Sequence, residues 1–360
     1  MERNNLSSTG IHNSSMASQL PDTAVKVVVT AAYAIIFPVA IMGNFLAIYI
    51  VFRKKSMRSV TNLLLVNMFV GNLLVAFIIM PYSVSYLYVQ HHWVGGAAGS
   101  LACKLLHFAY ALPIAASIFS LLLSSVDRYI AVLQPFKEIK LIRNTKASTT
   151  LIWLLSILFM SPYLYKFRAI KMADGNFYCM VDWSPADTVV ASQIYFIVIF
   201  VFLYTLPLLM IGTLYFRIGL KLWYRKIPGN ITKNSTRAAE HAKWKVIKML
   251  IIVVTVFAIS WVPAHSMHVL IYFDTQRYLG LPMWFKLMCF WVCHANSAVS
   301  PCIFVSLSEK FRHSFLSILR CVDGKRYDSS RDSMNSRVSS ERRIGKLTLS
   351  RRRSVEYTYV

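Results

Sequence analysis

Apolar and polar positions alternate in long blocks along this chain. Seven stretches contain no Asp, Glu, Lys or Arg, and they cover residues 27–52, 59–103, 105–126, 147–165, 188–216, 249–273 and 287–308. Each can supply the roughly 20 apolar residues that cross a bilayer core as an α-helix. The second stretch is too long for one crossing, so we expect a helix over 62–89 and then a loop around 91–96. The pattern predicts an all-α membrane protein, a seven-transmembrane helix bundle.

A shorter amphipathic pattern follows the seventh stretch. Between residues 308 and 321, apolar side chains at 311, 315, 316, 318 and 319 suit one face of a helix. We therefore predict a short amphipathic helix that lies on the inner membrane surface. Cys321 at its end suits palmitoylation, and a reduced cytosolic thiol is the alternative. The predicted organisation is a tail over 1–24, a helical domain over 25–321 and a polar, disordered tail over 322–360.

Composition and charge support the membrane assignment and orient the chain. Of the 360 residues, 56% are hydrophobic, more than an ordinary soluble domain contains. Of the 39 Lys and Arg residues, 31 lie in four alternate segments, 53–58, 127–146, 217–248 and 309–360. The positive-inside rule places these segments in the cytoplasm and the N-terminus outside. The net charge of +24 then faces anionic lipid and cytosolic partners, so it gives no reason to expect nucleic-acid binding.

The segments predicted to lie outside carry two kinds of modification signal. Asn5 and Asn13 each begin an Asn-X-Ser glycosylation sequon. Cys103 and Cys179 also lie outside, where disulfides persist, so we expect a bridge between them rather than two free thiols. The other four cysteines belong to no His/Cys cluster with metal-ligand spacing. We therefore predict no metal and no cofactor.

An acid, a base and an aromatic residue, Asp127-Arg128-Tyr129, close the third apolar stretch. One interpretation is that the helix has reached water and its charged flank snorkels. The other is a switch, in which Asp127 holds Arg128 until another helix moves. The apolar stretches contain no ionisable pathway of Asp, Glu, Lys or Arg, which argues against a transporter. No nucleophile–base pair or phosphate loop is apparent, so we predict that the chain is not an enzyme.

The order of several landmarks resembles the rhodopsin-like, or class A, family of G-protein-coupled receptors. These landmarks are Gly43-Asn44, Cys103, Asp127-Arg128-Tyr129, Trp153, Cys179, Pro207, Trp261-Val262-Pro263 and Ser300-Pro301. The resemblance covers roughly residues 25–321. It implies a plasma-membrane receptor that binds an extracellular ligand, activates heterotrimeric G proteins, and is recognised by receptor kinases and arrestin.

The resemblance also implies roles for individual residues. Arg128 is released on activation to contact the G protein, with support from Tyr215, and Trp261 forms the floor of the ligand pocket. Ile118, Pro207 and Phe257 form a packing triad beneath the ligand. The implied coupling and activation residues are Asp127, Arg128, Tyr129, Tyr215, Ile118, Pro207, Phe257, Pro301 and Phe304.

The chain departs from the family pattern at its centre. Asn72 replaces the usual acid of the second helix, and Ser300-Pro301-Cys302-Ile303-Phe304 replaces Asn-Pro-x-x-Tyr. A neutral amide at Asn72, with Ser300 nearby, weakens the family's sodium site, so we predict weak or absent sodium modulation. The sixth helix begins with Lys243 and Lys245 instead of an acid that clamps the arginine. We therefore predict elevated basal activity.

Candidate ligand-binding residues lie in the outer halves of three helices. They are Tyr110, Ile114, Trp261, His265, His268, Tyr272, Lys286, Phe290 and His294. By resemblance, Tyr110 occupies the position of the aspartate of amine receptors and His294 that of the lysine of opsins, which argues against both ligand types. The spacing four, three, four from Trp261 to Tyr272 indicates one stripe. This stripe is either an ordinary packed aromatic seam or a polar ligand site.

A peptide is the ligand we favour from the sequence. Residues 245–254 and Trp93 resemble neuropeptide receptors of the RF-amide and neuropeptide Y group, and loop acids at 174, 182, 187 and 274 can pair with basic ligand side chains. The alternatives are a lipid or small acid held by His265, His268 and Lys286, or a constitutively active orphan receptor. At the C-terminus, Thr358 and Val360 fit capture by a PDZ domain.

Overall fold

The structure is a computed structural model that describes residues 21–136, 139–223 and 233–322, without the side chains of 233–243 and 319–322. The chain divides into two units, Met1–Arg312 and His313–Val360, and the helix bundle belongs to the first. The predicted sites at Asn5, Asn13, Thr358 and Val360 lie outside the described residues, as does the side chain of Cys321.

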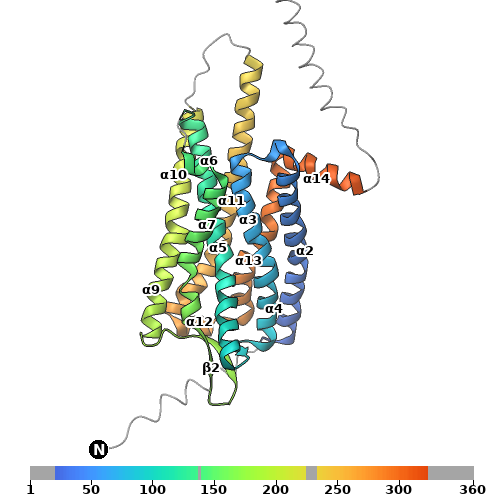
Figure 1. Ribbon diagram of the computed structural model, residues 1–360. Helices are drawn as coiled ribbons and strands as arrows, with labels where there is room; N and C mark the ends of the chain where they lie inside the picture. Colours follow the sequence, from blue (N-terminus) through green and yellow to red (C-terminus); the bar gives the residue numbers. More distant parts are fainter. Residues whose placement is uncertain (1–20, 137–138, 224–232, 323–360) are drawn as a thin grey trace, which may run out of the picture. The chain divides into compact units, whose positions relative to one another are not determined.

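Seven helical rods are long and apolar enough to cross a membrane, which confirms the predicted seven-helix architecture (Figure 1). In chain order they are α2 (Thr23–Arg53); α3 (Val60–Leu74), η2 (Val75–Ile79) and α4 (Met80–Val89); α5 (Gly96–Leu133); α7 (Thr145–Met160) with α8 (Tyr163–Lys166); α9 (Thr188–Phe200), η3 (Val201–Thr205) and α10 (Leu206–Trp223); α11 (Lys233–Phe273); and α13 (Met283–Leu307). The shorter helices are η1 (Lys55–Met57), α6 (Lys140–Arg143), α12 (Thr275–Gly280) and α14 (Glu309–Val322), the predicted helix after the seventh span.

Side-chain caps mark where several of these helices begin. The Ser59 hydroxyl accepts a hydrogen bond from the Asn62 N–H at the start of α3, and Asn144 does the same for Ala147 in α7. Such caps satisfy backbone donors that the first helical turn leaves without intrahelical partners. Helix α5 occupies the middle of the bundle, where it packs against α3, α7 and α10, and α13 packs against α11 and α2.

Two helices widen into a π-turn shortly before a proline. The π-turn η2 precedes Pro81, and η3 precedes Pro207. Proline lacks a backbone N–H and crowds the preceding turn, and a π-turn is one way in which a helix accommodates this. Nothing in the pattern of apolar residues indicated these π-turns.

Two helices extend beyond the apolar stretches that predicted them. Helix α5 begins at Gly96, before the stretch 105–126, and it continues past Arg128 to Leu133. The charged residue Lys104 interrupts the apolar stretch, but the residues before it still form helical turns. Likewise α10 extends beyond the apolar stretch to Trp223. Charge therefore marks where the hydrocarbon core ends, and the helices continue into the polar layers.

A small antiparallel sheet that the all-α prediction missed covers one end of the bundle. Its strands are β1 (His92–Trp93), β3 (Phe177–Val181) and β2 (Phe167–Lys171), in that order. Strands β2 and β3 form a hairpin in which Gly175 has φ +84°, a conformation that favours glycine. The Asp174-Gly175 pair between two runs of aromatic and branched residues was a usable hairpin signal. We call this end of the bundle the outer end, and the end with Arg128 the inner end.

Candidate functional site

A cavity lies among the outer halves of the helices. Helices α5, α7, α8, α9, α11 and α13 and the π-turn η3 contribute its wall. Seven of the nine predicted ligand residues line it: Tyr110, Ile114, Trp261, His265, His268, Tyr272 and Phe290. Trp261 and Phe257 line both this cavity and a smaller one deeper in the bundle.

The predicted stripe on α11 is partly packed and partly open. The His265 ring lies 4.4 Å from the Tyr204 ring, and His268 stacks against Tyr272 at 6.3 Å, between ring centroids. However, the buried Nδ1 of His265 and Nε1 of Trp261 have no hydrogen-bond partner among the described residues. Buried polar atoms are normally paired, so these two atoms indicate polar chemistry for an occupant of the cavity.

The other two predicted ligand residues do not line the cavity. His294 lies deeper, where Nδ1 is 2.8 Å from the Tyr33 hydroxyl and Nε2 is 3.0 Å from the Tyr110 hydroxyl. Both ring nitrogens are therefore used to join α2, α5 and α13. Lys286 is buried with its ammonium 4.6 Å from the centre of the Tyr278 ring, at the outer end of α13. Of the three predicted ligand residues on α13, only Phe290 lines the cavity.

Lys166 is a cavity residue that the sequence analysis missed. It ends the short helix α8, is 3% exposed, and lines the cavity. Its ammonium lies 4.0 Å from the centre of the Tyr163 ring and 4.6 Å from that of Tyr195. A lysine just after an apolar stretch normally reaches water by snorkelling, which is why the sequence indicated only a helix flank here. The aromatic wall of the cavity instead encloses the lysine side chain.

The four loop acids that the sequence offered to basic ligand groups already have partners within the protein. Asp187 and Asp274 cap α9 and α12, and Asp182 forms an ion pair with Arg168 at 3.3 Å. Asp174 accepts hydrogen bonds from Tyr178 and Asn176. The Tyr178 hydrogen bond is the largest cause of the lowered pKa of Asp174. These acids therefore organise the outer loops.

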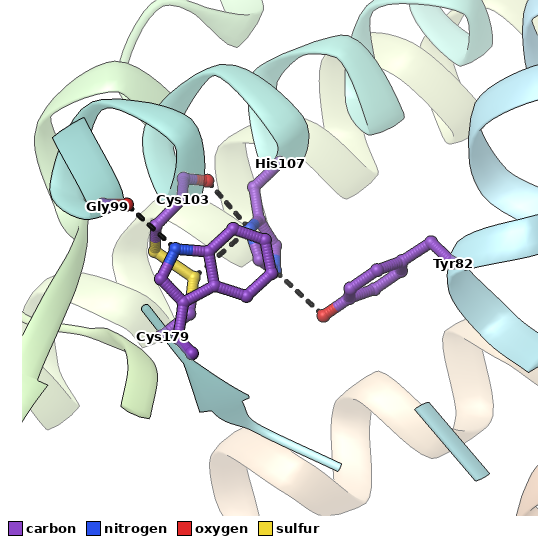
Figure 2. The surroundings of a disulfide bond; sticks show 6 residues. Tyr82, Gly99, Cys103, His107 and Cys179 are labelled. Atoms are coloured by element: carbon purple, nitrogen blue, oxygen red, sulfur yellow. Dashed lines mark hydrogen bonds between the residues drawn. A yellow bond between two sulfur atoms is a disulfide. The ribbon is translucent and has the colours of Figure 1, made fainter. Parts of the chain in front are cut away.

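The predicted disulfide between Cys103 and Cys179 is present, and it ties β3 to α5. Figure 2 shows its surroundings, in which His107 contacts the Cys103 carbonyl through Nδ1 at 2.9 Å and the Tyr82 hydroxyl through Nε2 at 3.2 Å. The Trp93 indole donates to the Gly99 carbonyl at 2.7 Å. The two cysteine sulfurs lie near His107, but as a disulfide they offer no thiolate to a metal. This cluster holds the sheet against the outer end of α5.

At the inner end, Arg128 is folded onto its neighbour. Its Nη2 lies 2.6 Å from Oδ2 of Asp127, and the Thr61 hydroxyl of α3 donates to the same carboxylate oxygen. Tyr215 of α10 accepts a hydrogen bond from Ser125 at 3.0 Å, one turn before Arg128. Tyr129 is partly buried. The structure thus holds the guanidinium against α5, the closed arrangement that a switch requires.

Between the two ends, the predicted packing triad is buried in the core: Ile118, Phe257 and Pro207. The sequence pattern of the family described as "7 transmembrane receptor (rhodopsin family)" matches residues 43–304. The chain belongs to this family. The matched region contains the cavity, the packing triad and the Asp127–Arg128 pair, so the predicted membership of the rhodopsin-like receptors is confirmed.

Individual receptors of the family are similar along most of the chain. The substance-P receptor of Cavia porcellus is 32% identical over 315 residues, 86% of this chain and 75% of that protein. The galanin receptor type 1 of Mus musculus is 30% identical, covering 80% of each chain. The neuromedin-K receptor of Mus musculus is 32% identical over 334 residues, 91% of this chain and 72% of that protein. This rhodopsin-family receptor is therefore a multi-pass plasma-membrane protein and not an enzyme.

Asn72, one of the residues at which this receptor departs from its family, lies in a neutral hydrogen-bond network. The Asn72 amide donates to Asn44 at 3.0 Å, and Asn44 donates to the Ala40 and Ser297 carbonyls. The deeper cavity is lined by Asn72 and Ser300, and no carboxylate belongs to its described wall. Neutral amides and hydroxyls fit the family's sodium ion poorly because they do not balance its charge.

Phe304 replaces a tyrosine of the family pattern and is fully buried. Its ring contacts Phe69 at 5.1 Å and Phe311 at 5.7 Å between centroids. The residue thus fills the space between α3, α13 and the first turn of α14. Pro301, one turn earlier, lies against Gly43 of α2. This end of α13 is held by apolar packing where the family pattern has a hydroxyl.

Proposed function

We propose that this receptor binds an extracellular peptide in the outer cavity and activates heterotrimeric G proteins at the inner end. The observation that carries the proposal is an aromatic cavity at one end of the bundle, with a closed Asp127–Arg128 pair at the other. The relatives support the peptide, since their names are those of receptors for substance P, galanin and neuromedin K. The narrower resemblance to the RF-amide and neuropeptide Y group stays a prediction.

The ligand contacts Tyr110, Ile114 and Phe290 from α5 and α13 and the α11 stripe from Trp261 to Tyr272. Trp261 and Phe257 lie on the walls of both cavities, so a ligand that moves them also changes the core beneath. The movement reaches Ile118 and Pro207 and then allows Arg128 to leave Asp127. Tyr215, Tyr129, Pro301 and Phe304 complete this inner region.

A lipid or small acidic ligand is the second candidate. The observation that favours it is a buried lysine in the cavity wall. A constitutively active receptor without a ligand remains the third interpretation of the sequence, based on Asn72 and Phe304. The cavity favours a ligand over this third interpretation, because its unpaired polar atoms need an occupant or water.

The orientation and the remaining partners are proposals from the sequence. The distribution of Lys and Arg supports an extracellular N-terminus, with glycosylation at Asn5 and Asn13, and a cytoplasmic C-terminus. Palmitoylation at Cys321 anchors the end of α14. The tail recruits receptor kinases and arrestin, and Thr358 and Val360 engage a PDZ domain.

The test is a second-messenger screen in transfected cells. Calcium and cyclic AMP are recorded against a neuropeptide library, with Arg128→Ala as the matched control. We expect a saturable response to at least one peptide that is lost in Arg128→Ala while the receptor stays at the cell surface. A response to no peptide, with a basal signal that rises with expression and falls in Arg128→Ala, overturns the peptide assignment and supports a constitutive receptor.

A further inference from the structure

The most unusual group in the outer cavity is the ammonium of Lys166. Its side chain is 3% exposed, and its Nζ faces the rings of Tyr163 and Tyr195 at 4.0 and 4.6 Å. The rings of Phe167 and Trp183 lie further away, at 5.3 and 6.0 Å. Aromatic faces attract a cation, but they do not accept its hydrogen bonds as a carboxylate does.

No protein acid neutralises this cation within the described part of the chain. The described wall of the cavity contains no Asp or Glu, and no described carboxylate forms an ion pair with Lys166. Its neighbour Arg168 differs, because Arg168 is paired with Asp182 and stacked near Tyr165 at 5.3 Å. A buried charge is costly unless it is paired. Lys166 therefore presents an unmet charge to whatever fills the cavity.

We propose that the cavity binds a carboxylate group of the ligand and that this carboxylate pairs with Lys166. The other unpaired atoms of the wall agree with this choice. Trp261 Nε1 can only donate a hydrogen bond, and His265 Nδ1 can donate in one tautomer. A carboxylate accepts and never donates when ionised. An ammonium or guanidinium on the ligand would instead meet a like charge in the cavity.

The loop acids give the second, independent reason. Asp182 and Asp274 form ion pairs with Arg168 and Arg277, and Asp187 caps α9. A basic ligand group that reached these acids would compete with the partners they already have. An acidic group at Lys166 meets no such competition. The charges at the outer end therefore favour an acidic ligand group in the cavity over a basic one.

The carboxylate has two sources in a peptide, an Asp or Glu side chain and a free C-terminus. This part of the inference rests on the proposed function, because it takes the ligand to be a peptide. The binding of a carboxylate at Lys166 does not rest on it, and a binding assay without a G protein tests it separately.

The first experiment uses the full-length receptor in nanodiscs and three small probes of the same shape: 3-phenylpropionate, 3-phenylpropanamide and 3-phenylpropylamine. Thermal unfolding is followed as each probe is titrated to its solubility limit at neutral pH. We expect 3-phenylpropionate to raise the unfolding temperature and the amide and the amine to act at least about tenfold more weakly, because hydrogen bonds to charged groups are the stronger ones. Equal effects of acid and amide, or no effect of the acid, would overturn the proposal.

Variants of Lys166 test whether this lysine causes the preference for 3-phenylpropionate. Lys166→Gln should remove the preference for the acid, and Lys166→Arg should keep most of it. Lys286→Gln is the matched control, because Lys286 is also buried beside an aromatic ring but lies outside the cavity wall. A preference that survives in Lys166→Gln, or that is lost in Lys286→Gln instead, contradicts the assignment. If Lys166→Gln does not fold, the comparison of the three probes on the wild-type receptor and on Lys166→Arg still tests the proposal.

The second experiment distinguishes the two sources of the carboxylate. A peptide agonist from the screen is compared with its C-terminal amide and with its Asp→Asn and Glu→Gln analogues. A loss of potency on amidation alone assigns the C-terminus, and a loss on one side-chain change assigns that side chain. No loss with any analogue overturns the proposal for peptides. If no peptide signals, the proposed function fails while the probe titration still reports on Lys166.

Discussion

Lys245 near the inner end of α11 donates to Glu309, the first residue of α14, with Nζ and Oε1 2.6 Å apart. The pair joins the helix that would move on activation to the turn that follows α13. The sequence analysis noted that α11 lacks the acid with which some relatives clamp the arginine. The structure shows that a cation of α11 is instead held by an acid of α14.

Loss of this ion pair should raise ligand-independent signalling. Lys245→Gln or Glu309→Gln removes one charge, which frees the inner end of α11 to move outward. Both side chains are about half exposed, so the pair contributes at most about 1 kcal/mol, or roughly fivefold in the population of the active form. The measurement is basal second messenger at matched surface expression. In the charge-swapped receptor Lys245→Glu/Glu309→Lys, basal signalling should return toward the wild-type level. Unchanged basal signalling in both single variants would show that the ion pair does not restrain α11.

The carboxylate of Asp127 should restrain signalling more strongly, because it is less exposed and has two partners. Asp127→Asn weakens its bonds to Arg128 and Thr61, and a hydrogen bond to a charged group contributes about 1.5–3 kcal/mol. We expect basal signalling to rise about tenfold in Asp127→Asn. Arg128→Ala should abolish the signal and leave the binding of 3-phenylpropionate intact. Equal basal signal in Asp127→Asn and wild type would show that the pair is a helix flank rather than a switch.

The seven-helix bundle could be predicted from the sequence because every transmembrane helix must meet the same requirement. About 20 residues must be apolar, and residues 27–52 or 249–273 show this without knowledge of their neighbours. The disulfide could be predicted for a similar reason, since Cys103 and Cys179 were the two cysteines on the outer side. Features that depend only on the solvent around a segment can be predicted from that segment alone.

The details of the cavity depend on contacts between segments, and the sequence did not show them. His294 and Phe290 lie four residues apart on α13, yet His294 points to Tyr33 and Tyr110 because their hydroxyls pair both of its nitrogens. Lys166 had the pattern of a snorkelling flank, and only the packing of Tyr163 and Tyr195 shows that it is enclosed. The sequence predicted which residues share one face of a helix. It did not predict which residues of other helices they contact.

The neutral network around Asn72 should make the receptor insensitive to sodium, and restoring an acid should reverse this. Asn72→Asp places a carboxylate in the cavity shared with Ser117 and Ser300, which supplies the anionic oxygen that a sodium ion needs. The measurement compares the unfolding temperature in sodium chloride and in N-methylglucamine chloride at equal ionic strength. Wild type should show no difference and Asn72→Asp a higher temperature in sodium. A sodium effect in wild type would contradict the prediction.

Removal of the disulfide should reduce the amount of folded receptor. The bridge closes a loop between cysteines 76 residues apart, and loops of this length correspond to about 3 to 5 kcal/mol in the chain-entropy description. Cys103→Ser and Cys179→Ser should each lower surface expression, and the double variant should be no worse than either single one. Cys302→Ser is the control, because that thiol is free. Normal expression of Cys103→Ser would show that the packing of Trp93 and His107 suffices to hold the sheet.

The contact between Gly43 of α2 and Pro301 of α13 should be sensitive to a single added methyl group. A Cβ added at Gly43 would lie 2.7 Å from Cγ and 3.0 Å from Cβ of Pro301, closer than van der Waals contact allows. Either the proline ring or the whole of α2 must shift, and overpacking of this kind costs typically about 1–3 kcal/mol. Gly212→Ala is the matched control, since nothing lies within 4 Å of its added Cβ and alanine favours the helix. Thermal unfolding in detergent should show a lower midpoint for Gly43→Ala and an equal or higher one for Gly212→Ala.

Because Pro301 directly precedes the segment that buries Phe304, Gly43→Ala should also change basal signalling, whereas Gly212→Ala should not. Equal midpoints for the two variants would mean that α2 moves away from α13 at little cost.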